Sequence, residues 1–128
     1  MNYGYKRIIN GSFEEIEAVV REKLQEQGFG VITEIDVKAT MRAKLDVDFT
    51  NYKILGACNP PAAHAALVKD PGIGLLLPCN VVLWENDDHS ITVAAIDAAK
   101  LLAITGNDEL TEFAQQINGS LISALDSL

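Results

Sequence analysis

The chain has 128 residues, of which 48% are hydrophobic and 22% are charged, enough apolar material for the core of one domain. Its formal net charge of −8 disfavours binding to the phosphate backbone of nucleic acids. No apolar run reaches the roughly 18 residues of a membrane-spanning helix, and the first residues lack the apolar core of a signal peptide. Two cysteines are too few for a disulfide scaffold. We therefore expect one cytoplasmic domain, residues 1–128, with reduced thiols and neither a nucleic-acid nor a membrane partner.

The first part of the chain predicts a strand, a helix and a second strand. Residues 3–9 are typical of a strand, and the capping-box spacing of Ser12 and Glu15 then predicts the start of an amphipathic helix. Apolar and polar residues alternate over residues 30–39, which predicts a strand with one exposed face. Residues 40–45 fit either a short helical turn or an excursion at the end of that strand.

The middle of the chain predicts a strand that leads directly into a short helix. Residues 52–58 form the strand. Asn59 is a favourable N-cap, and Pro60 follows at the first helical position, where its missing N–H costs nothing. The alanine-rich residues 60–69 have high helix propensity and complete the helix.

The last part of the chain predicts a hairpin followed by two helices. Residues 81–85 and 90–95 read as the hairpin, and Asp97 is placed to cap a short helix. Residues 110–128 have the longest amphipathic pattern, against which a sheet can pack. The order of these elements predicts an α+β fold with a mostly antiparallel sheet.

The two cysteines mark the candidate functional site. Cys58 and Cys79 are each followed by an asparagine, Asn59 and Asn80, and each has a proline beside this pair at a predicted strand boundary. His64, one of only two histidines, lies between them in the predicted helix. Sites tend to form on turns that are held by rigid elements.

Three interpretations of these residues stay open. Cys58 precedes a helix N-cap, which favours a reactive thiolate, and His64 would be its base, although about six positions of helix correspond to a rise of roughly 8–9 Å. Alternatively, Cys58, Cys79 and His64 would bind zinc, copper(I) or iron, although no Cys-x-x-Cys pair and no obvious fourth ligand accompany them. Finally, the cysteines would be small buried hydrophobes and the asparagines caps.

Two segments resemble the hallmark of the domain-of-unknown-function 302 family. They are YKILGACNPPAAH at residues 52–64 and IGLLLPCNVV at residues 73–82, with further similarity at residues 34–40, 95–97 and 105–107. The resemblance implies a small α+β protein of the TATA-binding-protein-like fold group. Its order would be strand, helix, four strands and helix, with two long helices on one sheet face plus a short inserted helix, and it would be a homodimer. The motif residues of the family map onto Cys58, Asn59, Pro60, His64, Pro78, Cys79, Asn80 and Asp97.

The sequence and the family resemblance together predict a cytoplasmic homodimer with a pocket around the two Cys-Asn turns. The predicted ligand is a metal ion, such as zinc, held by Cys58, His64 and Cys79, or a small molecule that also contacts Asn59 and Asn80. The alternatives are a thiol-dependent enzyme or redox sensor with Cys58 as its catalytic residue, and a purely structural or regulatory subunit. No further motif decides whether the protein is an enzyme.

Overall fold

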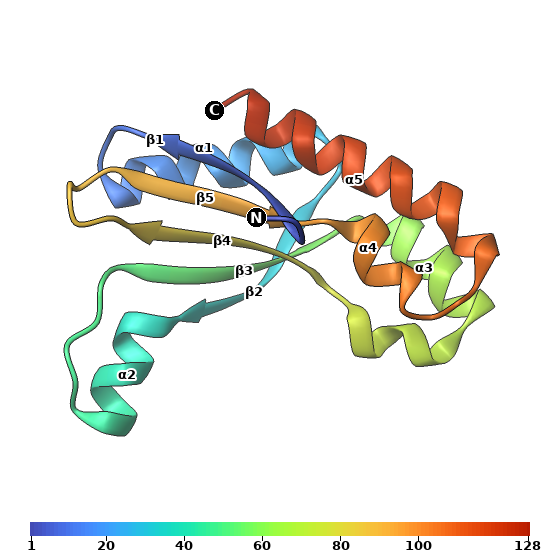
Figure 1. Ribbon diagram of the computed structural model, residues 1–128, viewed down its shortest axis with the longest axis horizontal. Coiled ribbons are helices and arrows are strands. Elements are labelled where there is room, and N and C mark those ends of the chain that lie inside the picture. The colour runs from blue at the N-terminus through green and yellow to red at the C-terminus, as the bar shows by residue number, and fades with distance from the viewer.

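The computed structural model describes all 128 residues and contains one five-stranded sheet with helices packed on one face (Figure 1). The strands are β1 (Gly4–Ile9), β2 (Gly30–Asp36), β3 (Tyr52–Cys58), β4 (Cys79–Glu85) and β5 (Ile91–Ile96). They lie in the order β1-β5-β4-β3-β2, and every neighbouring pair is antiparallel. The predicted α+β class and antiparallel sheet are confirmed.

Five α-helices and two short 3₁₀ segments complete the fold. The helices are α1 (Phe13–Glu26), α2 (Val37–Leu45), α3 (Pro60–Lys69), α4 (Ala98–Ala103) and α5 (Thr111–Asp126), and the 3₁₀ segments are η1 (Pro71–Leu76) and η2 (Asp108–Leu110). The predicted order of strand, helix, four strands and helix is found, with α2, α3 and α4 inserted. None of these helices combines the length and the apolar character needed to cross a membrane.

Local capping explains why the helices begin where the sequence predicts. The Ser12 hydroxyl accepts a hydrogen bond from the Glu15 N–H at 3.1 Å and starts α1. The Asn59 side chain accepts from the Ala62 N–H at 3.2 Å and starts α3. Asp97 caps α4 in the same way. Each cap satisfies a backbone donor that has no partner inside the helix.

The prediction of a strand over residues 30–39 is wrong beyond Asp36. The Asp36 carboxylate accepts a hydrogen bond from the Ala39 N–H at 3.0 Å, so Asp36 both ends β2 and serves as the N-cap of α2. The alternation of Ile35, Val37 and Ala39 spans too few residues to separate a strand from a helix start. No residue of α2 is buried, so the helix has no apolar stripe from which it could be predicted.

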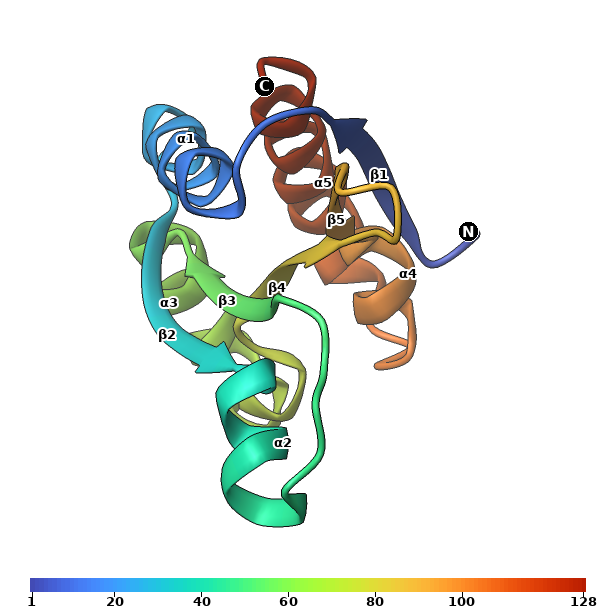
Figure 2. The same cartoon turned by 90° about the vertical axis from the view of Figure 1, so that its left-hand side faces the viewer.

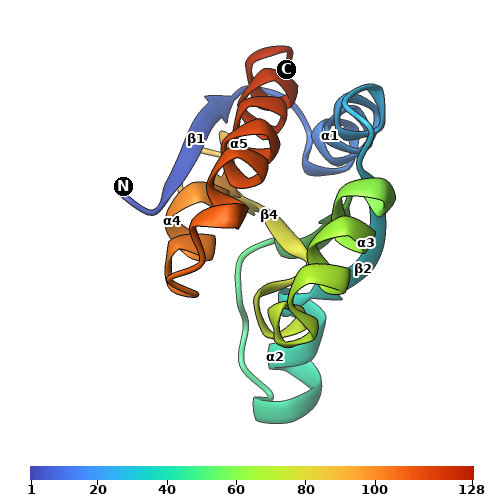
Figure 3. The same ribbon diagram turned by 90° about the vertical axis from the view of Figure 1, so that its right-hand side faces the viewer.

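The main core lies between one face of the sheet and the two long helices, α1 and α5 (Figure 2). Fully buried side chains from both layers meet there, among them Leu24, Leu55, Val81, Val93 and Leu121. A smaller cluster joins α3, η1, α4 and the start of α5 beyond the strand ends (Figure 3). The predicted packing of two long helices on one sheet face is therefore confirmed.

The opposite face of the sheet has no helix lying across it (Figure 2). Side chains alternate between the two faces of a strand, so the neighbours of buried core positions point this way. Six large apolar side chains on this side, which we call the open face, are Ile8, Ile35, Tyr52, Ile54, Val82 and Trp84. Tyr52 and Trp84 are partners in the β3–β4 register, and their rings stack with centroids 5.7 Å apart.

Candidate functional site

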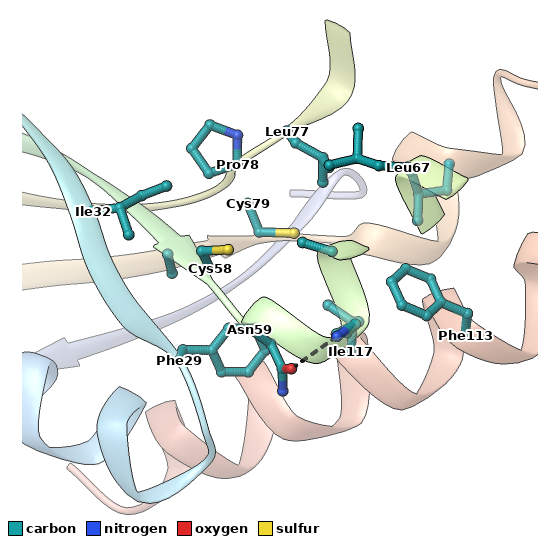
Figure 4. A pocket seen from close by; sticks show the side chains of 14 residues that line it. Phe29, Ile32, Cys58, Asn59, Leu67, Leu77, Pro78, Cys79, Phe113 and Ile117 are labelled. Carbon is teal, nitrogen blue, oxygen red and sulfur yellow. Dashed lines mark hydrogen bonds between the residues drawn. The ribbon is translucent and has the colours of Figure 1, made fainter. Parts of the chain in front are cut away.

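An apolar cavity of about 220 Å³ lies where the ends of β3 and β4 meet α3, α4 and α5 (Figure 4). We call it the cysteine cavity. Twelve of its fourteen lining residues are hydrophobic, and none is acidic, basic or histidine. The lining residues are Phe29, Ile32, Ala57, Cys58, Asn59, Ala62, Ala63, Leu67, Leu77, Pro78, Cys79, Leu102, Phe113 and Ile117.

The pairing of β3 and β4 brings the two cysteines to this cavity. Cys58 is the last residue of β3 and Cys79 is the first residue of β4, and the register pairs Cys79 with Ala57, the neighbour of Cys58. Between them the chain leaves the sheet, forms α3 and η1, and returns. This excursion supplies one wall of the cavity, and α4 and α5 supply another through Leu102 and Phe113.

Burial controls the chemistry of Cys79. Its side chain is buried, and this burial, together with the nearby charge of Cys58, raises the pKa of the Cys79 thiol to about 11. Both cysteines are free. Because of this raised pKa, Cys79 is present at neutral pH as a neutral thiol. The nucleophilic and metal-binding form of cysteine is the thiolate, so Cys79 has little of either reactivity. It therefore contributes an apolar, polarisable surface and a weak donor to the cavity.

Cys58 is half-buried, but the start of α3 offers it less support than the sequence suggests. Pro60 and Pro61 have no N–H, and the next N–H of the helix, that of Ala62, is bonded to the side chain of Asn59. The first turn of α3 therefore presents no free backbone donor to a thiolate on Cys58. His64, the predicted base, is exposed and does not line the cavity.

Three of the predicted ligand-binding residues meet at the cavity and two do not. Cys58, Asn59 and Cys79 line it. Asn80 is exposed, and it follows Cys79 in β4, so its side chain points to the opposite face of the sheet. His64 lies on the exposed side of α3. Nowhere in the structure do three or more His, Cys, Asp or Glu side chains form a cluster that could hold a metal ion.

Much of the cavity wall comes from residues that the sequence analysis did not single out. Phe29 and Ile32 come from the start of β2 and the turn before it, and Leu102, Phe113 and Ile117 come from α4 and α5. Phe113 and Ile117 belong to the amphipathic pattern of the last helix. That pattern shows that they face inward but does not distinguish a cavity wall from a filled core.

Comparisons with known proteins agree with this fold. The model of the family described as Domain of unknown function DUF302 matches residues 5–128. The crystal structure of an uncharacterized conserved DUF302 protein from Bacillus stearothermophilus is similar, with a TM-score of 0.90 and 26% sequence identity over 98% of each chain. No curated protein matches the sequence. Because the family model covers nearly the whole chain, this protein belongs to the DUF302 family.

Proposed function

We propose that this protein is a binding module for a small, neutral and largely apolar molecule, which it holds in the cysteine cavity. The observation that carries the proposal is the cavity itself, about 220 Å³ of space with hydrophobic walls and no charged side chain. For comparison, an apolar cavity of roughly 150 Å³ lined by Leu, Ile and Phe is large enough to bind benzene. A one-ring aromatic or a short branched aliphatic molecule is therefore the size of ligand that fits.

The lining also selects against charged ligands. An ionised group that moves from water into such walls loses hydration free energy, roughly several kcal/mol or more. A partner of opposite charge would compensate this loss, but the lining offers none. The polar groups at hand are two thiols and the Asn59 side chain, whose oxygen already caps α3. Thiol sulfur is polarisable and weakly hydrogen-bonding, which suits an apolar ligand that carries at most one polar group.

Both cysteines are free, and this supports binding in a reducing compartment. We therefore assign the module to the cytoplasm. In an oxidising compartment, two thiols at one cavity would be open to oxidation.

Filling the cavity provides the test. Ala63 lines it from α3, whereas Ala65 on the same helix is exposed and does not. Toluene serves as the probe, and thermal unfolding reports its binding, because a ligand that binds only the folded state raises Tm. Toluene at about ten times its Kd stabilises the folded state by roughly 1.4 kcal/mol. We expect this shift in the wild type and in Ala65→Leu and its loss in Ala63→Leu.

Two results would contradict the proposal. One is a wild type whose Tm does not respond to toluene or to any other neutral ligand of this size. The other is an Ala63→Leu variant that folds normally and still shows the full shift.

A thiophilic metal ion such as zinc is the second candidate ligand. The observation in its favour is that two free thiols line one cavity, at the ends of the paired strands β3 and β4. Metal binding would have to displace the Cys79 proton. Elemental analysis of anaerobically purified protein, beside Cys58→Ala and Cys79→Ala, decides this. Stoichiometric metal that is lost in both variants favours the metal, and metal-free protein rejects it.

A further inference from the structure

A second cavity of about 260 Å³, which we call the face pocket, lies on the open face of the sheet. Its walls come from β3, β4 and β5 and from the segment at the start of β1. It contains Asn80, the asparagine of the second Cys-Asn turn. The cysteine cavity leaves this residue unused, because Cys79 and Asn80 point to opposite faces of β4. The same turn thus supplies one residue to each of two cavities on opposite sides of the sheet.

One wall of the face pocket is an aromatic pair that is held in place. Tyr52 and Trp84 both line the pocket, and their stacked ring planes differ by only 8°. The Trp84 indole N–H donates to the Asn86 side-chain oxygen at 3.0 Å, and the Asn86 amide donates in turn to the Thr92 hydroxyl at 2.8 Å. The polar group of the indole is therefore satisfied and its orientation is fixed. A ring that is preorganised in this way loses little conformational entropy when a flat molecule stacks on it.

Small side chains next to Trp84 leave part of its ring uncovered. Tyr52 on β3 stacks on one side of the indole, and Trp84 is only partly buried. On β5, the register places Thr92 opposite Trp84 and Ala94 opposite Val82, and side chains of this size cannot cover an indole ring. Ala94 lines the face pocket and forms part of its floor. A flat molecule can therefore lie above Ala94 with its ring against Trp84.

Asn80 is the polar side chain of the face pocket that has no partner in the protein. It is exposed and makes no side-chain hydrogen bond, whereas the side chains of Asn59 and Asn86 are both bonded. Its register partner on β3 is Gly56, which has no side chain that could bond to it. A primary amide presents a donor and an acceptor side by side. It therefore matches a ligand that presents the same pair on one edge, as a lactam or a carboxamide does.

The strand geometry and the volume of the pocket both indicate the size of the ligand. Asn80 and Trp84 lie four residues apart on β4, which corresponds to about 13 Å between their Cα atoms at roughly 3.3 Å per residue. Their side chains close part of this gap, but a single ring is too short to reach from one to the other. A cavity of roughly 150 Å³ accepts one benzene ring, and the face pocket has about 260 Å³. Two fused rings fit both the span and the volume.

We infer that the face pocket binds a neutral molecule of two fused aromatic rings with a lactam or carboxamide edge. Its rings stack against Trp84 above Ala94, and its polar edge hydrogen-bonds to the Asn80 amide. The molecule carries no charge, because the lining has no charged side chain to compensate one and the net charge of −8 repels anions. This ligand differs from that of the cysteine cavity, where the oxygen of the Asn59 amide already caps α3.

A pair of matched probes tests the inference. Carbostyril has two fused rings with a lactam edge, and quinoline has the same rings without the lactam. Trp84 is the only tryptophan, so its indole N–H gives a single NMR signal that reports on the face pocket. We expect carbostyril to shift this signal saturably, with a Kd of about 1 mM or tighter. Quinoline should bind at least about tenfold more weakly. The absence of a saturable shift, or equal affinity for both probes, would overturn the inference.

Four variants locate the site. Asn80→Ala should weaken the binding of carbostyril at least about tenfold and leave that of quinoline unchanged, because it removes only the amide partner. Asn10→Ala is its control, since Asn10 is exposed and does not line the pocket. Ala94→Leu should abolish the binding of both probes by filling the floor. Ala63→Leu, which fills the cysteine cavity, should change neither Kd.

Three results with these proteins would overturn the inference. One is an Asn80→Ala variant that binds carbostyril as the wild type does; because this exposed side chain makes no hydrogen bond, the test does not depend on whether Ala94→Leu folds. The second is the loss of carbostyril binding in Ala63→Leu, which would place the probe in the cysteine cavity. The third is a Trp84 signal that shifts with protein concentration and not with carbostyril, which would mean that a second chain occupies this face.

Discussion

Cys58 ends β3 and Cys79 begins β4, so the two cysteines stand where the chain leaves the sheet and where it returns. The segment between them forms α3 and η1 and covers the cavity that both cysteines line. The Cys-Asn turns therefore combine two roles. The cysteine of each turn faces the cavity, while Asn59 caps the covering helix and Asn80 continues β4 on the other face of the sheet.

The buried Cys79 thiol should make stability depend on pH in the alkaline range. Its pKa rises from the ordinary 9.0 to about 11 in the folded protein, so the folded state holds the thiol proton more tightly than the unfolded chain. This contribution is complete below the unfolded value, and it is lost as the pH rises through the window between the two values. Its full size is about 3 kcal/mol, because each pKa unit corresponds to roughly 1.4 kcal/mol.

Urea unfolding across this range, for the wild type and Cys79→Ala, measures the effect. The variant loses a buried side chain at every pH, but its free energy of unfolding should fall less steeply than that of the wild type. Other alkaline groups, such as Lys53, are common to both proteins and cancel in the comparison. Parallel curves for the two proteins would contradict the assigned burial of Cys79.

The two thiols should differ in their reactivity toward alkylating agents. Cys58 is half-buried, whereas Cys79 is buried and remains protonated near neutral pH because of its raised pKa. We expect maleimide to modify Cys58 in the folded protein and Cys79 only after unfolding, with a rate ratio of at least about tenfold. Peptide mass spectrometry measures both rates, and each Cys→Ala variant confirms the assignment. Faster modification of Cys79 would reject this account of the cavity.

Gly56 should tolerate no side chain, because of where it lies on β3. A Cβ atom at this position would stand 2.0 Å from the Thr33 hydroxyl oxygen and 2.7 Å from the Pro78 ring, closer than real Cβ contacts. Gly56→Ala should therefore destabilise the protein by about 1–3 kcal/mol. Gly119→Ala is the matched control, since Gly119 lies in α5 with nothing within 4 Å of an added Cβ. It should stabilise by about 0.5–1 kcal/mol. Equal effects of both variants on urea unfolding would show that Gly56 is not crowded.

A partly buried ion pair should contribute to stability at pH values above those at which carboxylates are protonated. Lys53 on β3 lies 2.8 Å from Glu17 on α1 and 3.3 Å from Glu34 on β2. Burial alone would raise the pKa of Glu17, but hydrogen bonds from Lys53 and Arg21 lower it below its ordinary value. Because the folded pKa is lowered, the stabilisation is present above the unfolded value of 4.5 and is lost as the pH falls through the folded value.

Lys53→Ala should therefore cost about 1 kcal/mol near neutral pH. The difference from the wild type should shrink as the pH falls through the lowered pKa of Glu17, because the protonated side chain no longer forms the ion pair. Lys44→Ala is the control, because Lys44 is exposed on α2 and makes no ion pair; it should change stability by less than about 0.5 kcal/mol. A Lys53→Ala deficit that does not depend on pH would mean that packing, and not the ion pair, is responsible.

The parts of the fold that sequence patterns predict are those fixed by nearby residues. Caps at Ser12, Asn59 and Asp97 act within three positions along the chain, so they are visible as short motifs. Asp36 is a cap of the same kind, but the alternation of apolar residues around it imitates a strand. With no buried face on α2, nothing in the sequence corrects that interpretation.

The candidate site was predictable only in part, for a similar reason. The clustering of Cys58 and Cys79 at strand boundaries indicates that they meet. The period-2 alternation of a strand also implies that Cys79 and Asn80 cannot both face one pocket. By contrast, Phe113 and Ile117 reach the cavity through the packing of α5, which depends on contacts far apart in the sequence. No local pattern separates a wall that leaves space from a wall that is filled.

The measurement that tests the central claim most directly is a titration with toluene followed by methyl NMR. The account predicts saturable shifts of the methyl signals of Ala62, Leu67 and Leu102, which line the cysteine cavity, while those of Val68 and Ile104 on the surface stay constant. Ala63→Leu should abolish these shifts. Shifts confined to the open face, or none in a folded wild-type protein, would contradict the claim that the cysteine cavity is the binding site.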